Sequence, residues 1–328
     1  MIMKGHLLVL FLSWVLFSAL VLGSDLPSVC LCLVTRDEME DLGEWIAYHH
    51  SLGVSHVIIF ENNSENSSLS DPDIMKWARS GFIKSYNYFM ENSEPNNQLY
   101  AYKTCLKQFG HQFDFMGFID TDEFVVIKDR NSTLPQVLEP YKSFGGLVVN
   151  SMFLGSNGHI SRPTGGVLSN YNKCVYSNLV KSFVVPKHTQ DTGPTPHAFK
   201  YNQGFFAVDV AKKFVDSAWN PRGNGLSMYG RSVGDHLFEK IFINHYIVKS
   251  LADYKRKMRR GSGDGAARGL HFFHEMNSLA VNNCSYLELP RSPNPELFFD
   301  RRSGGWVQVD RDPVHHQITG MHTPEGSR

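Results

Sequence analysis

Apolar and polar positions alternate between strand and helix patterns along the first third of the chain. A continuous apolar run at residues 29–34 is typical of a strand buried on both faces, and further strands are predicted at 54–60, 83–88 and 113–119. Helical faces between them are formed by Leu42, Trp45, Ile46 and His49 before Gly53, and by Leu99, Tyr102, Leu106 and Phe109 before Gly110. Asp37 and Glu40 resemble a capping box at the start of the first helix. This alternation predicts an α/β fold with a doubly wound, mostly parallel sheet.

The regular alternation of strand and helix patterns ends after residues 147–149. Short strands predicted at 180–185, 204–208 and 241–246 stand among loops rich in Gly and Pro. We interpret them as a mixed C-terminal extension of the same sheet, so residues 25–290 are expected to form one domain. Residues 291–328 combine Pro, Gly and charged residues without a period, and we expect them to form a polar, poorly ordered tail.

The N-terminus carries an apolar stretch at residues 7–22, preceded by Lys4 and followed by Gly23 and Ser24. Residues 1–24 are therefore expected to be either a cleaved signal peptide or an uncleaved anchor that would attach the protein to a membrane. Both alternatives direct the rest of the chain into the lumen of the secretory pathway, where we expect it in the Golgi. Sequons for N-glycosylation, at Asn62, Asn66, Asn131 and Asn283, agree with that compartment.

Charge and cysteine content argue against nucleic acid as a partner and against a zinc site. Lys plus Arg and Asp plus Glu both number 32, so the net charge is zero near neutral pH, and no long-range field favours nucleic acid as a partner. The five cysteines are an odd number, so at least one thiol is unpaired or pairs with another chain. Their spacing does not match a zinc site.

The strongest chemical signal is the acidic cluster at residues 118–124. An apolar strand delivers Asp120 and Asp122 to its carboxyl end, which is where ligands of open α/β sheets bind. Two carboxylates one residue apart form a hard-oxygen platform for Mg²⁺ or Mn²⁺, with phosphate oxygens and water completing the coordination. The alternative is a solvated acidic turn, which the apolar residues on both sides make a poorer explanation.

A second signal lies at residues 241–250. His245 ends an apolar strand and would supply a metal ligand, and Lys249 follows four residues later, where it would meet a diphosphate. Taken alone, this segment is better explained by a packed core histidine and a solvated lysine. The basic run at 255–261 adds candidate phosphate contacts, although such runs usually form a solvated helix face.

Two loops follow the first and second predicted strands. The first contains Thr35, Arg36 and Glu38, and the second contains Asn62 and Ser64. Because parallel strands end at the same edge of a sheet, both loops should open beside Asp120 and hold the base and ribose of a nucleotide. Each loop read singly is an ordinary turn.

Together these segments resemble glycosyltransferase family 92 and the related family-2-like glycosyltransferases. The resemblance runs in order from about residue 29 to residue 283. It includes Thr35-Arg36-Asp37-Glu38, Glu44-Trp45-Ile46 with His49, Leu52-Gly53-Val54, the 62–64 turn, Gln98, Cys105, residues 119–124, Asn244-His245-Tyr246, Lys249-Ser250 and Arg260-Gly261. Asp37 stands where the first motif more usually has Asn, which puts its nucleotide contact in question.

The resemblance implies a GT-A-like fold, a nucleotide-sugar donor and a divalent cation, Mn²⁺ or Mg²⁺. It implies transfer of galactose from UDP-galactose to a glycan acceptor, with inversion. Asp122 would then bind the metal, Asp120 the metal or the ribose, His245 the metal and Lys249 the diphosphate, and Gln98 would belong to the donor site. Inversion requires a carboxylate base, for which Glu275 and Asp235 are the candidates.

Two other functions are weighed against this one. A metal-dependent phosphohydrolase would also place carboxylates and histidines at a sheet edge, but two close metals require more ligands than this cluster offers. An inactive glycan-binding protein would keep the fold but would not need both aspartates and His245.

Overall fold

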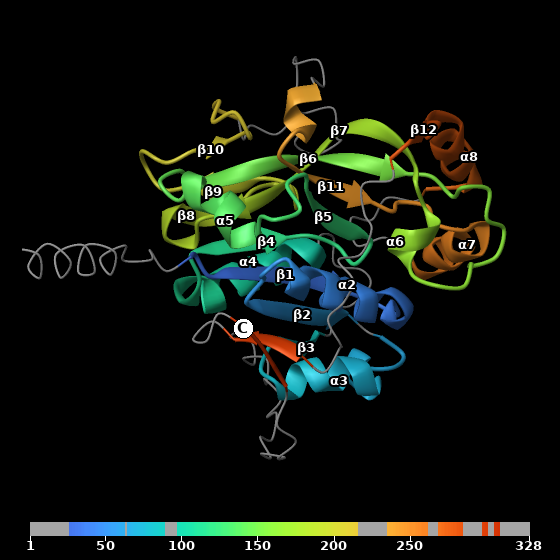
Figure 1. The fold of residues 1–328 in the computed structure, drawn as a ribbon, viewed down its shortest axis with the longest axis horizontal. Coiled ribbons are helices and arrows are strands. Elements are labelled where there is room, and N and C mark those ends of the chain that lie inside the picture. The colour runs from blue at the N-terminus through green and yellow to red at the C-terminus, as the bar shows by residue number, and fades with distance from the viewer. Residues whose placement is uncertain are drawn as a thin grey trace, which may run out of the picture.

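The computed structural model describes residues 26–62, 64–88, 97–215, 235–261, 268–284, 297–300 and 305–308 (Figure 1). Its main sheet has ten strands among these residues, with the central order β3-β2-β1-β4-β7-β6-β11-β5. In Figure 1 the strands β1 to β3 lie in the lower half of the molecule and β5, β6 and β7 in the upper half. The two halves of the sheet differ in strand direction.

The first half of the sheet is parallel. It consists of β1 (Val29–Thr35), β2 (His56–Asn62), β3 (Ile83–Tyr88) and β4 (Phe115–Phe118), paired in the order β3-β2-β1-β4 with every pair parallel. The carboxyl ends of β1, β2 and β4 therefore meet at one edge of the sheet.

The second half of the sheet is mixed. Strand β7 (Lys173–Val184) runs antiparallel to β4 and to β6 (Gly146–Leu154), and β11 (Ile241–His245) runs parallel to β6 but antiparallel to β5 (Glu123–Ile127). The short strand β10 (Ala207–Val208) joins β6, and β12 (Asn282–Asn283) joins β7. The predicted α/β class, with a parallel first half and a mixed extension, is confirmed.

Helices cover both faces of the parallel half. Helix α2 (Met39–Ser51) packs Trp45 into the same apolar cluster as Leu31 of β1. Helix α4 (Asn97–Phe109) packs Tyr102 into a second cluster together with Cys32 of β1. Alternate residues of β1 thus meet helices on opposite sides of the sheet, which explains why this strand is apolar throughout.

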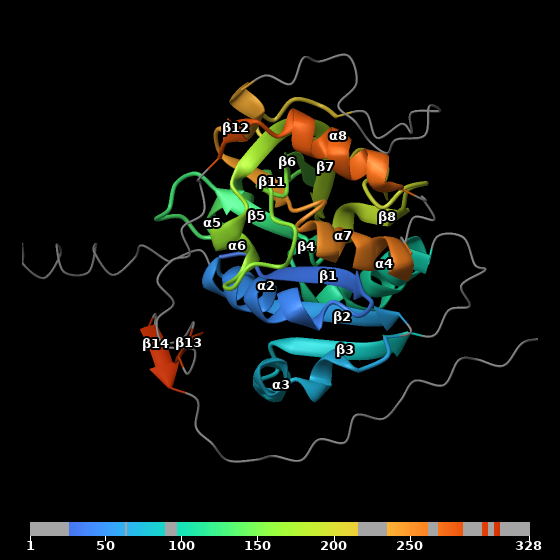
Figure 2. The same cartoon turned by 90° about the vertical axis from the view of Figure 1, so that its right-hand side faces the viewer.

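The remaining elements surround this core. They are α3 (Pro72–Arg79), α5 (Leu134–Leu138), α6 (Val167–Asn170), α7 (Leu251–Arg260), α8 (Leu270–Leu279), the β8–β9 pair (Thr189–Thr192 and Phe199–Tyr201), the β13–β14 pair (Leu297–Asp300 and Gly305–Gln308) and several short 3₁₀ helices. Helices α7 and α8 lie together on the side of the sheet toward which β11 points (Figures 1 and 2).

The predicted capping box of the first helix is wrong. Glu38, not Asp37, precedes α2, and its side chain makes no capping hydrogen bond. Asp37 instead adopts a positive φ of 52°, which Asp tolerates better than most residues. Its amide donates to Ser64 Oγ at 3.2 Å, and its Oδ1 accepts the Glu65 amide at 2.8 Å. Asp37 therefore ties together the loops after β1 and β2.

Disulfides account for four of the five cysteines. Cys32 of β1 is joined to Cys105 of α4, and Cys174 of β7 is joined to Cys284. Cys30 is buried as a free thiol, so the cysteine left over by the odd count lies inside the core.

Within the described ranges, the structure contains no helix with both the length and the apolar character that a membrane crossing requires. The apolar stretch at residues 7–22 lies outside those ranges, as does most of the 291–328 segment apart from β13 and β14.

Candidate active site

The acidic turn, which we define as residues 119–123, connects β4 to β5 at the carboxyl edge of the sheet. Trp45 of α2 supports it, because its indole N–H lies 3.1 Å from the Asp120 carbonyl oxygen and 2.7 Å from that of Glu123. The Tyr246 amide, just after β11, donates to the Asp122 carbonyl at 2.8 Å. Two elements that are distant in sequence therefore fix the backbone of the turn.

Asp120 is surrounded by hydrogen-bond donors from two elements. From α4, Gln98 Nε2 lies 2.5 Å and the Tyr102 hydroxyl 3.1 Å from Asp120 Oδ1. From β7, Lys181 Nζ lies 2.9 Å from Oδ2. Burial alone would raise the pKa of the Asp120 carboxyl, but the charge and hydrogen bond of Lys181, together with His245, outweigh it and the pKa is lowered. The carboxylate is thus ionised and held in one orientation.

Lys181 also pairs with Glu123, whose side chain is fully buried. Its Nζ lies 3.0 Å from Glu123 Oε2, and its own side chain is only 1% exposed. Burial would lower the pKa of this lysine, but Asp120 and Glu123 outweigh burial and raise the pKa well above its ordinary value. Burial raises the pKa of the Glu123 carboxyl, and Lys181 offsets only part of that effect. The result is a buried ammonium that bridges two carboxyl groups of the acidic turn.

His245 reaches the same turn from β11. The antiparallel pairing of β11 with β5 places it opposite Glu123. Its Nε2 lies 3.5 Å from Asp122 Oδ1, and its Nδ1 lies 3.3 Å from Glu123 Oε1. Neither Nδ1 nor Oε1, both buried, completes a hydrogen bond with the described residues. The imidazole therefore stands between two carboxyl groups, with Nε2 toward Asp122 and Nδ1 toward Glu123.

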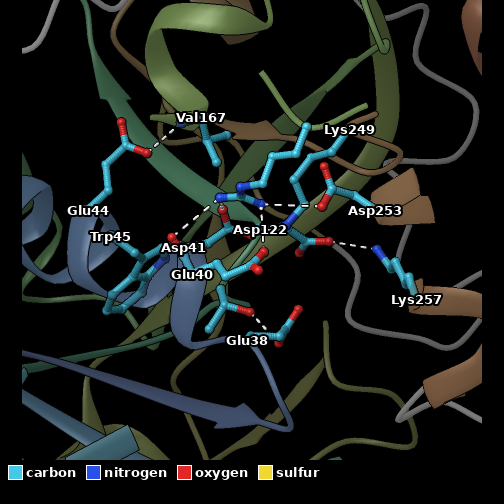
Figure 3. Close-up of polar contacts among 12 residues, drawn as sticks. Glu38, Glu40, Asp41, Glu44, Trp45, Asp122, Val167, Lys249, Asp253 and Lys257 are labelled. Atoms are coloured by element: carbon cyan, nitrogen blue, oxygen red, sulfur yellow. Dashed lines mark hydrogen bonds and ion pairs between the residues drawn. The ribbon is translucent and has the colours of Figure 1, made fainter. Parts of the chain in front are cut away.

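Asp122 has a second cationic neighbour. Lys257 of α7 places its Nζ 2.6 Å from Asp122 Oδ2 (Figure 3). Burial would raise the pKa of the Asp122 carboxyl, but Lys257 and His245 together hold the pKa well below its ordinary value. Asp122 is therefore ionised, with Oδ1 facing an imidazole and Oδ2 facing an ammonium.

Lys249 is placed differently from the diphosphate contact expected for it. Its ammonium pairs with Asp41 of α2, and the residue is only 8% exposed. Asp41 also binds Arg162, which lies 3.4 Å from Asp253 of α7. Lys249 thus belongs to a largely buried ion-pair network (Figure 3). The network joins three segments, namely α2, α7 and the loop that precedes α6.

Glu38 links the first loop to both the acidic turn and α7. Its Oε2 accepts the Thr121 hydroxyl, and its Oε1 lies 2.8 Å from Arg260 Nη1. The same guanidinium donates to the Arg36 carbonyl at 3.0 Å. The predicted nucleotide loop is therefore brought to the acidic turn, with Glu38 engaged in positioning it.

Other expected donor contacts lie at the ends of β1 and β2. Thr35 Oγ1 and Asn62 Oδ1 are buried and have no hydrogen-bond partner among the described residues. Ser64 Oγ accepts the Asp37 amide. Two polar atoms at this edge thus have hydrogen-bonding capacity that the described residues do not use.

The two candidate bases are less well placed by the structure. Glu275 is exposed on α8. Asp235 begins a 3₁₀ helix at Asp235–Phe238, but its side chain lies outside what the structure describes. Neither is brought against the acidic turn by a described contact.

Lys181 and Glu123 are site residues to which the sequence reasoning gave no role, and Lys257 was considered only as a member of the basic run at 255–261. Lys181 interrupts an apolar run in β7, and a lysine inside such a run signals a buried carboxylate partner. Glu123 follows Asp122 directly, and only its complete burial shows that it is more than part of an acidic surface.

The described residues contain no preformed group of three His, Cys, Asp or Glu side chains able to hold a metal ion. Asp122 and His245 are the pair whose polar atoms face each other, 3.5 Å apart. The Glu123 carboxyl behind Nδ1 matches the usual arrangement in which a carboxylate orients a metal-binding histidine. A cation here would fit if phosphate and water oxygens completed its coordination.

Known proteins with similar sequences point to one family. A glycosyltransferase family 92 protein of Oryza sativa subsp. japonica is 29% identical over 147 residues, covering 44% of this chain and 24% of that protein. One of Ricinus communis is 24% identical over 256 residues, covering 74% of this chain and 42% of that protein. The chain thus spans less than half the length of these relatives.

Among solved structures, S. aureus TarS 1-349 in complex with UDP is similar at 14% identity and a TM-score of 0.33, covering 48% of this chain and 47% of that one. A likeness that low carries no argument about the site. The model of glycosyltransferase family 92, by contrast, matches residues 27–192, which is half of the chain and includes the acidic turn and Lys181. This chain belongs to glycosyltransferase family 92.

Proposed function

We propose that this protein is a metal-dependent glycosyltransferase that moves a sugar, galactose from UDP-galactose, onto a glycan acceptor with inversion. The observation that carries the proposal is the Asp122 carboxylate at the carboxyl edge of the sheet, 3.5 Å from His245 Nε2. Family membership supports glycosyl transfer as the reaction class. The choice of galactose and of inversion rests on the family resemblance alone.

Asp122 and His245 would hold the divalent cation, Mn²⁺ or Mg²⁺. The chemistry supplied by that cation is neutralisation of the charge that develops on the diphosphate as the bond to the sugar breaks. Glu123 would fix the imidazole, since its Oε1 lies 3.3 Å from Nδ1. Lys181 would hold Glu123 in place, because its Nζ lies 3.0 Å from Oε2.

Asp120 would bind the ribose end of the donor. Gln98 and Tyr102 engage its Oδ1, and Lys181 engages Oδ2, which leaves Oδ2 a further lone pair for a ribose hydroxyl. The unpaired Thr35 Oγ1 and Asn62 Oδ1 would meet the nucleoside beyond it. The catalytic base would be Glu275 or Asp235, acting on the acceptor hydroxyl.

A donor screen tests the proposal. The full chain is incubated with several UDP- and GDP-sugars and mixed glycan acceptors, with and without Mn²⁺, and both nucleoside diphosphate and glycosylated product are measured. We expect product from UDP-galactose only when the metal is present, with UDP formed in equal amount.

Other outcomes of the screen point to the competing functions. Donor cleavage in equal amounts with and without acceptor would indicate a hydrolase. Glycan binding without any donor turnover would indicate an inactive binding protein. Product formed at the same rate in chelator would contradict the assignment of Asp122 and His245 as metal ligands.

A further inference from the structure

One oxygen of the carboxylate proposed to bind the metal is already paired with a cation from the protein itself. Lys257 extends from α7 toward Asp122 (Figure 3), and its Nζ lies 2.6 Å from Oδ2 and 3.1 Å from the Ile247 carbonyl. The other oxygen faces His245. A divalent cation bound by Asp122 would therefore compete directly with Lys257 for a negatively charged ligand.

Lys257 can exchange partners in a way that Lys249 cannot. The Lys257 side chain is 25% exposed, whereas the Lys249 side chain is 10% exposed and paired with Asp41. A lysine ammonium is a compact charge on a flexible four-carbon stem, so it can change partner by side-chain rotation alone. Departure of Lys249 from Asp41 would instead leave a buried carboxylate with Arg162 as its one remaining ion-pair partner among the described residues.

The helix that carries Lys257 does not depend on the Asp122 contact for its position. Arg260 Nη1, three residues later, lies 2.8 Å from Glu38 Oε1 and 3.0 Å from the Arg36 carbonyl oxygen. Arg256 Nη2 lies 2.6 Å from Glu40 Oε2. These contacts hold α7 against the loop after β1 and the start of α2 while the Lys257 side chain moves.

We propose that Lys257 is an internal counter-cation that pairs with Asp122 in the donor-free protein and moves to a phosphate oxygen of the donor when a divalent cation takes its place. The inference rests on the proposed function and adds to it a residue that couples the two ligands. The exchange keeps every charge paired. The Asp122 carboxylate replaces the Lys257 ammonium with the divalent cation as its partner, and the Lys257 ammonium replaces the carboxylate with a phosphate oxygen of the donor. Neither Asp122 nor Lys257 is left without a partner, which would be costly for a buried charge.

The exchange makes binding of metal and of nucleotide mutually dependent. Metal alone must displace Lys257 without offering it a new partner, so it binds weakly. Nucleoside diphosphate supplies that partner, so each ligand strengthens the binding of the other by the same factor. A site with this property avoids holding free metal and favours the metal–nucleotide complex.

The test measures binding of Mn²⁺ and of UDP separately in the full chain. Mn²⁺ affinity without nucleotide is obtained from the paramagnetic resonance signal of the unbound ion, and UDP affinity at saturating Mn²⁺ from calorimetry. For Lys257→Met we expect Mn²⁺ alone to bind about tenfold more tightly and UDP about tenfold more weakly, each the scale of one charge-assisted contact. The opposite signs distinguish exchange from a general weakening of the site.

Lys255→Met is the matched control. Lys255 belongs to the basic run at 255–261, but the structure places it on an exposed face of α7, two residues from Lys257 and on another side of the helix, so we do not expect it to contact phosphate. It removes the same charge from the same helix and should leave both affinities unchanged. Lys257→Gln, which keeps a polar side chain, should reproduce the effects of Lys257→Met and provides a second folded variant. Thermal melting curves establish that each variant is folded.

Unchanged Mn²⁺ affinity in both folded Lys257 variants would overturn the exchange, even if UDP bound more weakly. Tighter Mn²⁺ binding with unchanged UDP affinity would overturn the movement to phosphate. The wild-type protein reports on the proposed function itself: if UDP binds it equally well with and without Mn²⁺, the metal-dependent function fails, and the exchange fails with it.

Discussion

The two aspartates of the acidic turn lie two residues apart but in different surroundings. Asp120, whose side chain is 31% exposed, is held by Gln98, Tyr102 and a lysine that is 1% exposed. Asp122 meets His245 and a lysine that is 25% exposed. The cation that holds Asp120 thus lies in the protein core, whereas the cation beside Asp122, itself only 7% exposed, lies nearer the surface. The difference assigns fixed positioning to the Asp120 side and ligand exchange to the Asp122 side.

Among the tests of this comparison, we expect the largest effect on stability from replacing Lys181. Lys181→Met leaves the Asp120 and Glu123 carboxyl groups together at the acidic turn without the cation that bridges them. We expect the free energy of unfolding to fall by about 3–5 kcal/mol, the range for removing one member of a buried ion pair. Chemical denaturation at neutral pH measures it.

Two further variants calibrate the Lys181 result. Lys76 forms an exposed pair with Asp73, with side chains 68% and 79% exposed, so Lys76→Met should cost less than about 1 kcal/mol. Lys257→Met should cost less than about 3 kcal/mol, the upper range for a hydrogen bond to a charged group. If Lys257→Met destabilised the protein as much as Lys181→Met, the two neighbourhoods would not differ as described.

The next effect concerns the chemistry of Asp122. Asp122→Asn keeps the size of the side chain but removes an ionised ligand, so sugar transfer should fall by about two orders of magnitude, or about 2.7 kcal/mol of transition-state stabilisation. Steady-state rates with UDP-galactose and Mn²⁺ measure it, and Asp73→Asn, on the exposed surface of α3, is the matched control. A folded Asp122→Asn protein with the wild-type rate would remove Asp122 from the reaction.

The smallest effect, when measured between neutral and mildly acidic pH, is a pH dependence of stability that comes from His49 on the core side of the acidic turn. His49 packs beneath β5, where its Nε2 accepts the Val125 amide at 3.3 Å, and its burial lowers its pKa from 6.5 to about 3. The folded protein therefore keeps His49 neutral while the unfolded chain takes up a proton below about pH 6.5. The associated stability is present above that pH and is lost as the pH falls toward 3, at up to about 1.4 kcal/mol per pH unit.

Denaturation curves at three pH values between neutral and mildly acidic measure this slope in the wild type and in His49→Gln. The variant should lose less stability per pH unit, because its side chain does not titrate. An identical slope in the two proteins would show that His49 does not contribute to the pH dependence in this range.

The parallel half of the fold was accessible to prediction because its signals are local. Strands buried on both faces are apolar throughout, and the helices between them show one apolar face each, so β1, β3, α2 and α4 follow from the pattern. Strand β5 was not predicted, since its apolar residues directly follow the acidic turn and no breaker separates them from it. The cap of α2 was mispredicted because the side chain of Asp37 bonds across to the next loop instead.

The sequence predicts individual residues of the site but not which of them contact one another. The pattern identifies Asp120, Asp122 and His245 as polar residues at strand ends, yet only the antiparallel pairing of β11 with β5 places His245 opposite Glu123. Lys257 and Asp122 are 135 residues apart, and no periodicity relates them. Tertiary contacts of this range decide which charges meet, and local sequence patterns do not encode them.

The Cys32–Cys105 disulfide has a consequence for the integrity of this site. It joins residues 73 positions apart, so the chain from β1 to α4, with α2, β2, α3 and β3 inside it, is a covalent ring. A single peptide-bond cut within that ring would yield two fragments that part only after reduction, as electrophoresis would show. Until then the helix that carries Gln98 and Tyr102 would stay tethered to the strand beside the acidic turn. The side chains that orient Asp120 are thus secured by a closed loop of chain as well as by packing.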